Sequence, residues 1–142
     1  MVTGPEHNKA VFRRFNQMMN QHDTPAMVGV LHEKFIDYNC MSPVPLDRAA
    51  CIKTIKAFLD AFPDLNFHTD ELIAEGNRVT SRWTATGVFN GPDFFGIPTT
   101  GKPARFGGIE IVTVEGDWIV ERNIEFNAYL MLKQVGLMPP GL

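Results

Sequence analysis

The stretch RVTSRWTATGVFNGPDFFGIPTTGKPARFGGIEIVTV, residues 78–114, contains two strand-like runs separated by a segment rich in glycine and proline. In the first run the side chains alternate, so that Arg82 falls on one face and Trp83 on the other. A period of two with β-branched and aromatic residues is typical of a β-strand. In the second run, residues 105–115, both faces are mostly apolar and Glu110 falls on one of them. This pattern predicts a second strand that is covered on both sides.

Two features of this stretch indicate an enclosed cavity beside the sheet. The first is Glu110, whose carboxylate has apolar neighbours. Because a buried charge needs a partner, we expect Glu110 to contact Arg82 on the neighbouring run. The second is the intervening segment FFGIPTTGKP, residues 94–103, which is too apolar for an idle loop and is stiffened by two prolines and two glycines. We expect this segment to lie as a flap over the mouth of the cavity.

The same stretch resembles the signature of a known family. Residues 82–87 read RWTATG, residues 95–101 read FGIPTTG and residues 106–111 read FGGIEI. This succession is similar to that of the SnoaL-like polyketide cyclases, a branch of the nuclear transport factor 2-like superfamily, and the similarity extends over residues 8–136. It implies a cone-shaped α+β barrel whose interior holds the active site. It says little about the reaction, because one architecture hosts many chemistries.

The remaining elements agree with an α+β layout in which N-terminal helices pack on a strongly curved, mainly antiparallel sheet. Asp23 or Thr24 can cap a short helix that runs to about Leu31, and Asp47 can cap a longer one. Periodicity and turn residues predict helices at 6–21, 48–61 and 127–135, an extended segment at 32–39, a loop at 40–46, and strands at 66–74 and 118–126.

Length and charge exclude several classes of protein. A chain of 142 residues is long enough for one domain with its own core, and we expect residues 1–142 to form that single domain. A net charge of −3 without a basic stripe gives no electrostatic footprint for nucleic acid. No apolar run approaches a membrane span, and the first residues do not resemble a signal peptide. We therefore expect a cytoplasmic protein whose partners include neither nucleic acid nor a membrane.

No metal or other cofactor is expected. The four histidines show no metal-ligand spacing, and Cys40 and Cys51 cannot form a metal framework of their own. The spacing of the two cysteines leaves a disulfide open. No nucleophile elbow and no phosphate-cradling glycine loop occurs. Chemistry is left to carboxylates, a tyrosine, an arginine and amides around an apolar pocket.

The resemblance also implies where an acid/base group would stand. The family usually keeps its catalytic aspartate at the end of the last strand, in a motif like EHWDxxD. The corresponding run here is ERNIEFN, residues 121–127, so that Ile124 stands at the aspartate position and Asn127 at the second aspartate. Isoleucine cannot move a proton, which argues against the usual aldol cyclisation. We expect Ile124 to line the cavity; a one-residue bulge that turns Glu125 inward is the alternative.

Four residues are the catalytic candidates. An apolar surround would raise the pKa of Glu110 and suit general acid/base work, whereas a close Arg82 would lower it and suit a fixed ion pair. Tyr38 could donate a hydrogen bond to a developing enolate or be a half-buried core tyrosine. Asn123 could orient a substrate carbonyl or cap the closing helix. Asp37, beside Tyr38 in the sequence, is expected to be solvated.

Large apolar side chains are expected to form the walls of the cavity. Core packing is the alternative for each of them, and helix capping is the alternative for Asn127. Methionines and aromatic residues together suit an irregular, flat hydrophobic ligand. The predicted substrate-binding residues are Met19, Phe58, Phe62, Phe95, Phe106, Ile124 and Asn127.

The resemblance and these candidates favour a cofactor-independent enzyme that acts on a cyclic or polyketide-like hydrophobic small molecule. Its reaction would be a cyclisation or isomerisation by general acid/base proton transfer in an enclosed pocket. The alternative is a non-catalytic ligand-binding or accessory protein of the same fold. A third interpretation is an epoxide hydrolase of the limonene type, which uses an Asp–Arg–Asp triad. Only Arg82 matches that triad, because Thr84 and Ile124 stand at the two aspartate positions.

A homodimer is the expected assembly. Trp83, Ile111 and Trp118 supply apolar side chains for the outer face of the sheet, which a single layer leaves uncovered. The family resemblance implies the same assembly.

Overall fold

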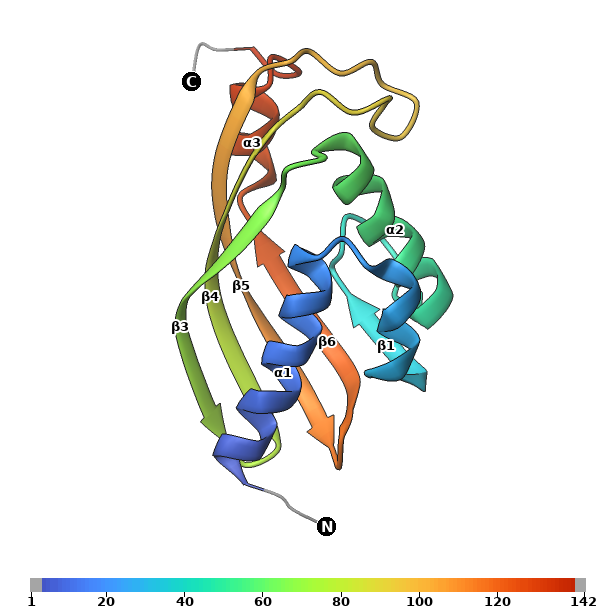
Figure 1. The fold of residues 1–142 in the computed structure, drawn as a ribbon, viewed down its shortest axis with the longest axis vertical. Helices are drawn as coiled ribbons and strands as arrows, with labels where there is room; N and C mark the ends of the chain where they lie inside the picture. The colour runs from blue at the N-terminus through green and yellow to red at the C-terminus, as the bar shows by residue number, and fades with distance from the viewer. Residues whose placement is uncertain (1–3, 140–142) are drawn as a thin grey trace.

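A six-stranded sheet curls around the N-terminal helix (Figure 1). The computed structural model describes residues 4–139. The strand order is β2-β1-β6-β5-β4-β3, in which β1 and β6 run parallel and the other neighbours antiparallel. The strands are β1 (Leu31–Tyr38), β2 (Leu46–Asp47), β3 (Asn66–Glu75), β4 (Arg78–Val88), β5 (Pro103–Glu115) and β6 (Trp118–Phe126).

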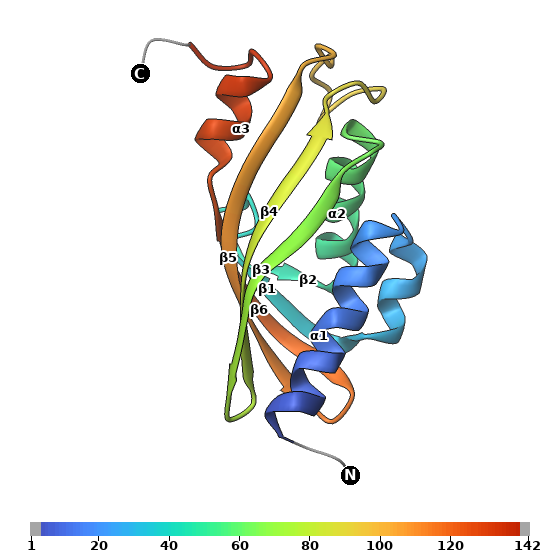
Figure 2. The same ribbon diagram turned by 60° about the vertical axis from the view of Figure 1, so that its left-hand side comes forward.

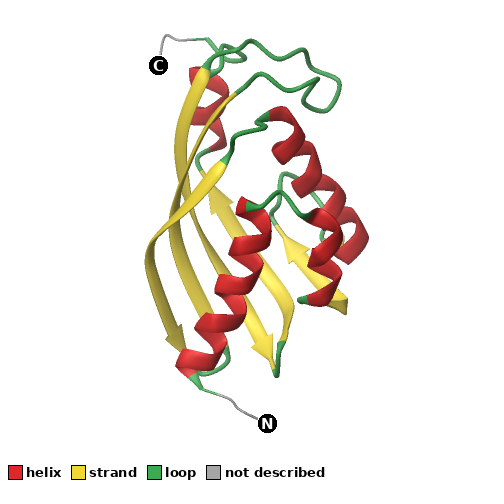
Figure 3. Ribbon diagram, in the orientation of Figure 1, coloured by secondary structure: helices red, strands yellow, loops and turns green. Residues whose placement is uncertain are grey.

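The helices lie on both sides of this sheet. They are α1 (Pro5–Asn20), the 3₁₀-helix η1 (Thr24–Gly29), α2 (Arg48–Ala61) and α3 (Ala128–Gln134), drawn in red in Figure 3. Figure 2 shows α1 and α2 on one side of the sheet and α3 on the other, near the start of β5. The predicted α+β class and the curved, mainly antiparallel sheet are confirmed. The sheet does not close into a full barrel, because β2 and β3 remain at its two edges.

Short polar side chains begin three of these helices as the sequence predicts. Asp47 accepts a hydrogen bond from Ala50 N at 2.9 Å, and Asn127 accepts one from Leu130 N at 3.0 Å. Asp23 caps η1 in the same way, but this helix is 3₁₀ and ends at Gly29. It stops short of the expected Leu31 because Leu31 already pairs with β6. The predicted loop 40–46 likewise ends in the short strand β2, which pairs with β1.

The inner face of the sheet is shaped by one glycine. Gly108 on β5 pairs with Trp83 on β4, and a Cβ on Gly108 would lie 2.7 Å from Cζ2 of the indole and 2.6 Å from the carbonyl oxygen of Glu125. The missing side chain therefore gives the indole room to lie across the neighbouring strand. Trp83 is buried on this inner face. The expectation that it covers the outer face is wrong, because it alternates with the exposed Arg82.

The segment between β4 and β5 extends past the C-terminal end of α2 (Figure 1). Gly91 N donates to Ala61 O at 3.0 Å, and a Cβ on Gly91 would lie only 1.8 Å from Asp60 O, so a side chain cannot fit at this approach. The ring of Phe94 packs on Phe58 of α2 with centroids 5.0 Å apart. These contacts hold the predicted flap against α2.

Replacing Gly108 with alanine should lower the free energy of unfolding by about 1–3 kcal/mol, the usual cost of overpacking. The added Cβ must displace either the indole of Trp83 or strand β6. Gly29→Ala is the matched control, because its Cβ would meet nothing within 4 Å. Its effect should stay within about 0.5 kcal/mol. Urea-induced unfolding measures both, and equal stability of the two variants would contradict the packing described.

Candidate functional site

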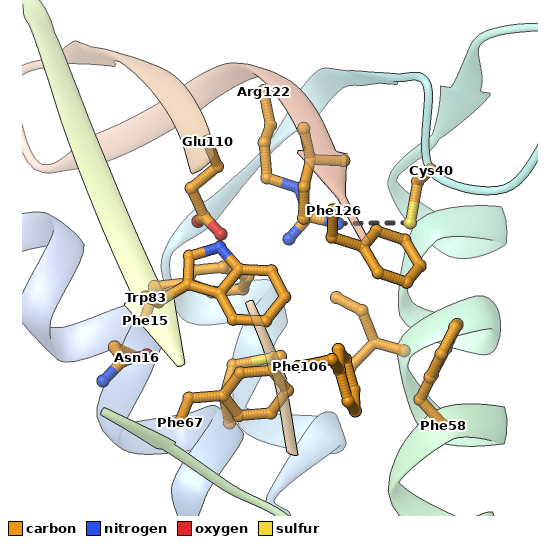
Figure 4. A pocket seen from close by; sticks show the side chains of 13 residues that line it. Phe15, Asn16, Cys40, Phe58, Phe67, Trp83, Phe106, Glu110, Arg122 and Phe126 are labelled. Carbon is orange, nitrogen blue, oxygen red and sulfur yellow. Dashed lines mark hydrogen bonds between the residues drawn. The ribbon is translucent and has the colours of Figure 1, made fainter. Parts of the chain in front are cut away.

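A narrow cavity lies between α1, α2 and the inner face of the sheet (Figure 4). Its free volume is about 50 Å³. That space holds a few water molecules, so a larger ligand needs the lining side chains to move. The lining is almost wholly apolar, with an acidic, a basic, an amide and a thiol group among the rings: Phe15, Asn16, Met19, Cys40, Ile55, Phe58, Phe67, Trp83, Phe106, Glu110, Arg122, Ile124 and Phe126.

Strand alternation selects which residues reach this cavity. On β6, Arg122, Ile124 and Phe126 face inward because successive side chains point to opposite sides of a sheet. The register pairs Ile124 with Glu110 on β5, so the two side chains are direct neighbours on the inner face. The prediction that Ile124 lines the cavity is confirmed. The predicted wall residues Met19, Phe58 and Phe106 also lie there.

A buried ion pair borders the cavity. Arg122 Nε donates to Asp37 Oδ1 at 3.0 Å and Nη2 donates to Asp37 Oδ2 at 2.7 Å, which makes the contact bidentate. Both side chains are buried, and the guanidinium lies 5.8 Å from the ring centroid of Phe15. Burial disfavours the charge of Arg122, but Asp37 and the nearby thiols outweigh it and hold its pKa well above the ordinary value. The expectation that Asp37 is solvated is wrong.

Two thiols complete this cluster. Cys51 Sγ donates to Asp37 Oδ2 at 3.0 Å, and Arg122 Nη2 lies 3.4 Å from Cys40 Sγ. Both cysteines are free, so the disulfide left open by the sequence is not formed. Burial raises the pKa of Cys40 to about 11 and raises that of Cys51 further. The thiols are therefore protonated at neutral pH and act as hydrogen-bonding groups rather than as nucleophiles.

Glu110 is the acidic group of the cavity. Its side chain is buried with a relative exposure of 7%, and its carboxyl lies on the same side of the cavity as the indole nitrogen of Trp83 (Figure 4). Burial raises the pKa of Glu110; the charge of Arg122 and the indole N–H oppose this shift, and Asp37 adds to it. The net direction is upward, because burial outweighs the two influences that lower the pKa.

The predicted contact between Arg82 and Glu110 is wrong. The register pairs Ser81 with Glu110 and Arg82 with Ile109, so Arg82 points to the outer face. Its side chain is 49% exposed there and binds Glu71 Oε1 from Nη2 at 2.9 Å. An epoxide hydrolase triad built on Arg82 cannot form in this cavity.

The other two catalytic candidates also lie outside the cavity lining. Tyr38 follows the inward-facing Asp37, and Asn123 follows the inward-facing Arg122, so both turn to the outer face. Glu125 does not turn inward through a bulge: it pairs opposite Ile109 and accepts a hydrogen bond from Asn39. The alternation of β1 and β6 explains all three placements.

Three predicted wall residues have other positions. Phe62 is fully buried in the core, where its ring packs on Phe89 with centroids 5.1 Å apart. Phe95 is exposed on the flap, and Asn127 caps α3. The sequence analysis missed Arg122, although it stands two residues before Ile124 and so shares its face.

Within residues 4–139 no group of three or more His, Cys, Asp or Glu side chains could hold a metal ion. None of the helices described is both long and apolar enough to cross a membrane.

Comparisons with known proteins agree on the fold. Residues 9–135 match the family profile described as SnoaL-like polyketide cyclase. AclR from Streptomyces galilaeus, described as a candidate hydroxylase, aligns with a TM-score of 0.85 and 23% identity over 96% of this chain and 85% of its own. TsrD from Streptomyces laurentii aligns with a TM-score of 0.83 and 20% identity over 96% of this chain and 100% of its own. IdmH from Streptomyces antibioticus, described as a candidate polyketide cyclase, aligns with a TM-score of 0.79 and 20% identity over 91% of this chain and 98% of its own. The search of curated proteins gives no match.

Replacing Asp37 with asparagine should lower the free energy of unfolding by about 3–5 kcal/mol, because it leaves the buried guanidinium of Arg122 without its counter-charge. The matched control is Glu71→Gln, which breaks the exposed pair with Arg82 and should cost less than about 1 kcal/mol. Chemical denaturation of both variants measures the difference. Similar losses in the two variants would mean that the Asp37 pair is hydrated in solution.

Proposed function

This chain belongs to the SnoaL-like polyketide cyclase family, and on that premise we propose that it is a cofactor-independent enzyme for hydrophobic small molecules. Its reaction is a cyclisation or isomerisation by proton transfer at a carbon beside a carbonyl group. Glu110 is the acid/base, and the aromatic side chains around it bind the apolar body of the substrate.

The observation that carries this proposal is the position of Glu110. It is a carboxyl buried in an apolar cavity, and burial raises its pKa. A carboxylate with a raised pKa is a stronger base, and its conjugate acid can return the proton near neutral pH. The neighbouring Ile124 stands at the position implied for the family's aspartate and cannot take this role.

The proton transfer has two halves. Ionised Glu110 removes a proton from the carbon, and the electron pair of the broken C–H bond moves onto the carbonyl oxygen to give an enolate. In an isomerisation, protonated Glu110 returns the proton to another carbon of the delocalised system. In a cyclisation, the enolate carbon attacks a second carbonyl of the same molecule, and Glu110 protonates the resulting alkoxide.

A non-catalytic ligand-binding protein is the second candidate. The observation that favours it is Ile124, whose side chain lies in the cavity beside Glu110. The same apolar lining would then serve only to hold a ligand.

Replacing Glu110 with glutamine separates these two candidates. In D₂O the wild-type protein should catalyse exchange of the α-protons of cyclohexanone or 2-tetralone, followed by proton NMR. Glu110→Gln should lower this rate by about 10²–10⁴-fold, because glutamine keeps the shape of the side chain and cannot accept the proton. Glu125→Gln, on the outer face, is the control and should keep the wild-type rate. Equal rates in wild type and Glu110→Gln, with ligand binding intact, would favour the binding protein.

The wild-type protein should have a pH-dependent stability that Glu110→Gln lacks. Burial raises the pKa of Glu110, so the folded protein keeps this proton at pH values where the unfolded chain has released it. The free energy of unfolding should therefore fall as pH rises from the ordinary pKa of glutamic acid towards the raised value. Glu110→Gln should remove this part of the pH dependence, and urea unfolding at pH 5 and pH 8 measures it. An unchanged difference between the two pH values would place the Glu110 carboxyl in contact with water.

We also propose a homodimer formed through the outer face of the sheet. Ile73 on β3 and Ile109 on β5 are 60% and 48% exposed there, and the register joins Ile73 through Thr80 to Ile111. The apolar residues of this face are therefore these isoleucines and not Trp83, which is buried. Trp118 is also partly exposed, although its ring packs against His32.

Analytical ultracentrifugation at micromolar concentration should show a dimer, because a second sheet would remove these isoleucines from water. Replacing Ile73 and Ile109 with lysine should give a folded monomer. Val44→Lys is the control, because this side chain is equally exposed but lies in the loop before β2. A wild-type monomer would contradict the proposed assembly.

A further inference from the structure

Two N–H groups at the cavity, one on Trp83 and one on Arg122, make no well-formed hydrogen bond within residues 4–139. The indole Nε1–H of Trp83 is buried and donates no well-formed hydrogen bond to any residue within 4–139. The Nη1 group of Arg122 takes part in none of the contacts of that guanidinium, all of which use Nε and Nη2. Donors that lack a well-formed hydrogen bond in an apolar interior are costly. The indole N–H already acts on the neighbouring Glu110 carboxyl, whose pKa it lowers, so an oxygen atom of a ligand would share this N–H with Glu110 and accept a hydrogen bond from Nη1 of Arg122.

Both donors face the same space. Figure 4 shows Nη1 of Arg122 turned away from Cys40, towards the side of the cavity where the Glu110 carboxyl and the indole nitrogen of Trp83 lie. The side chains come from neighbouring strands, Trp83 from β4, Glu110 from β5 and Arg122 from β6. Ser81 Oγ is also buried without a partner, but it does not line the cavity.

The surrounding packing fixes the direction of each donor. Asp37 holds two nitrogens of Arg122 in a bidentate contact, so the planar guanidinium can present only its remaining edge to the cavity. Gly108 has no side chain and so leaves room on β5 for the indole of Trp83. Donors held in this way require little reorganisation when a charge develops on a ligand.

We propose that Arg122 Nη1 and Trp83 Nε1 form an oxyanion-binding pair, so that the ligand is a compact apolar molecule with a carbonyl, enolate or carboxylate oxygen. This inference deepens the proposed function by naming the group that Glu110 faces. In the proton transfer described above, the electron pair that reaches the carbonyl oxygen would be stabilised by these two N–H groups. Arg122 and Trp83 would then contact the substrate directly, while Asp37 positions Arg122.

The charges around Glu110 give this pair a defined pH dependence. Arg122 on β6 and Asp37 on β1 balance each other, Cys40 and Cys51 add uncharged thiols, and the cavity residues of α1 are uncharged. A protonated Glu110 therefore leaves a neutral site with donors on several sides, whereas an ionised Glu110 repels an anionic ligand. An anion should bind more tightly below the raised pKa of Glu110 than above it.

Benzoate and toluene test the proposal, because they share one ring and only benzoate carries anionic oxygens. Titrations of ¹⁵N-labelled protein should show benzoate shifting the indole N–H signal of Trp83 and leaving that of Trp118 in place. Trp83→Phe keeps an aromatic ring and removes the donor, so it should weaken benzoate binding about tenfold or more while leaving toluene binding unchanged. Trp118→Phe is the matched control and should bind both as the wild type does.

A second experiment measures benzoate binding at two pH values and uses the variant Glu110→Gln. Wild-type protein should bind benzoate more tightly at pH 5.5 than at pH 8, and Glu110→Gln should bind it equally at both. Absence of benzoate binding at pH 5.5 would overturn the proposal, as would an equal loss of benzoate and toluene in Trp83→Phe. Because every readout here is binding, a failure of the proton-transfer function would appear separately, as α-proton exchange that does not depend on Glu110.

Discussion

The ion pair between Asp37 and Arg122 is the constraint on which the site depends. A buried charge is strongly destabilising unless it is paired with an opposite charge. Strands β1 and β6 must therefore pair in the register that brings Asp37 beside Arg122. This is the parallel pair of the sheet, and α2 and α1 add Cys51 and Phe15 to the same cluster. The pair therefore ties the strand that follows the first helices to the last strand of the chain.

The pair also sets the electrostatics of the cavity. Asp37 neutralises Arg122 and occupies two of its nitrogens, which leaves one directed group for the cavity rather than a mobile charge. The charge of Arg122 therefore lowers the pKa of Glu110 by less than burial raises it. Had the carboxyl and the guanidinium formed a closed pair of their own, Glu110 would be a fixed anion with little use as an acid or base.

The fold and the reaction are separate questions in this family. The structural neighbours include proteins described as a candidate hydroxylase and a candidate cyclase, and at identities below 25% they show the fold alone. In this chain, Ile124 stands where the sequence resemblance places an acid/base aspartate, and Glu110 lies directly opposite it on the next strand. In this chain the carboxyl of the inner face therefore lies on β5, directly opposite Ile124 on β6.

Sequence patterns alone determined most of the elements and which side chains of one strand share a face. Alternation in residues 78–114 placed Glu110 on the same side as Phe106, and helical spacing with an Asp47 cap placed α2, because these signals are local. Which strands become neighbours, and in which register, was decided by the tertiary structure. It paired Ser81 rather than Arg82 with Glu110. It also buried Asp37 and brought Arg122 from β6 close to both Asp37 and Glu110. A single strand specifies only which of its side chains share a face; the partner of a buried charge depends on contacts between residues that are far apart in the chain.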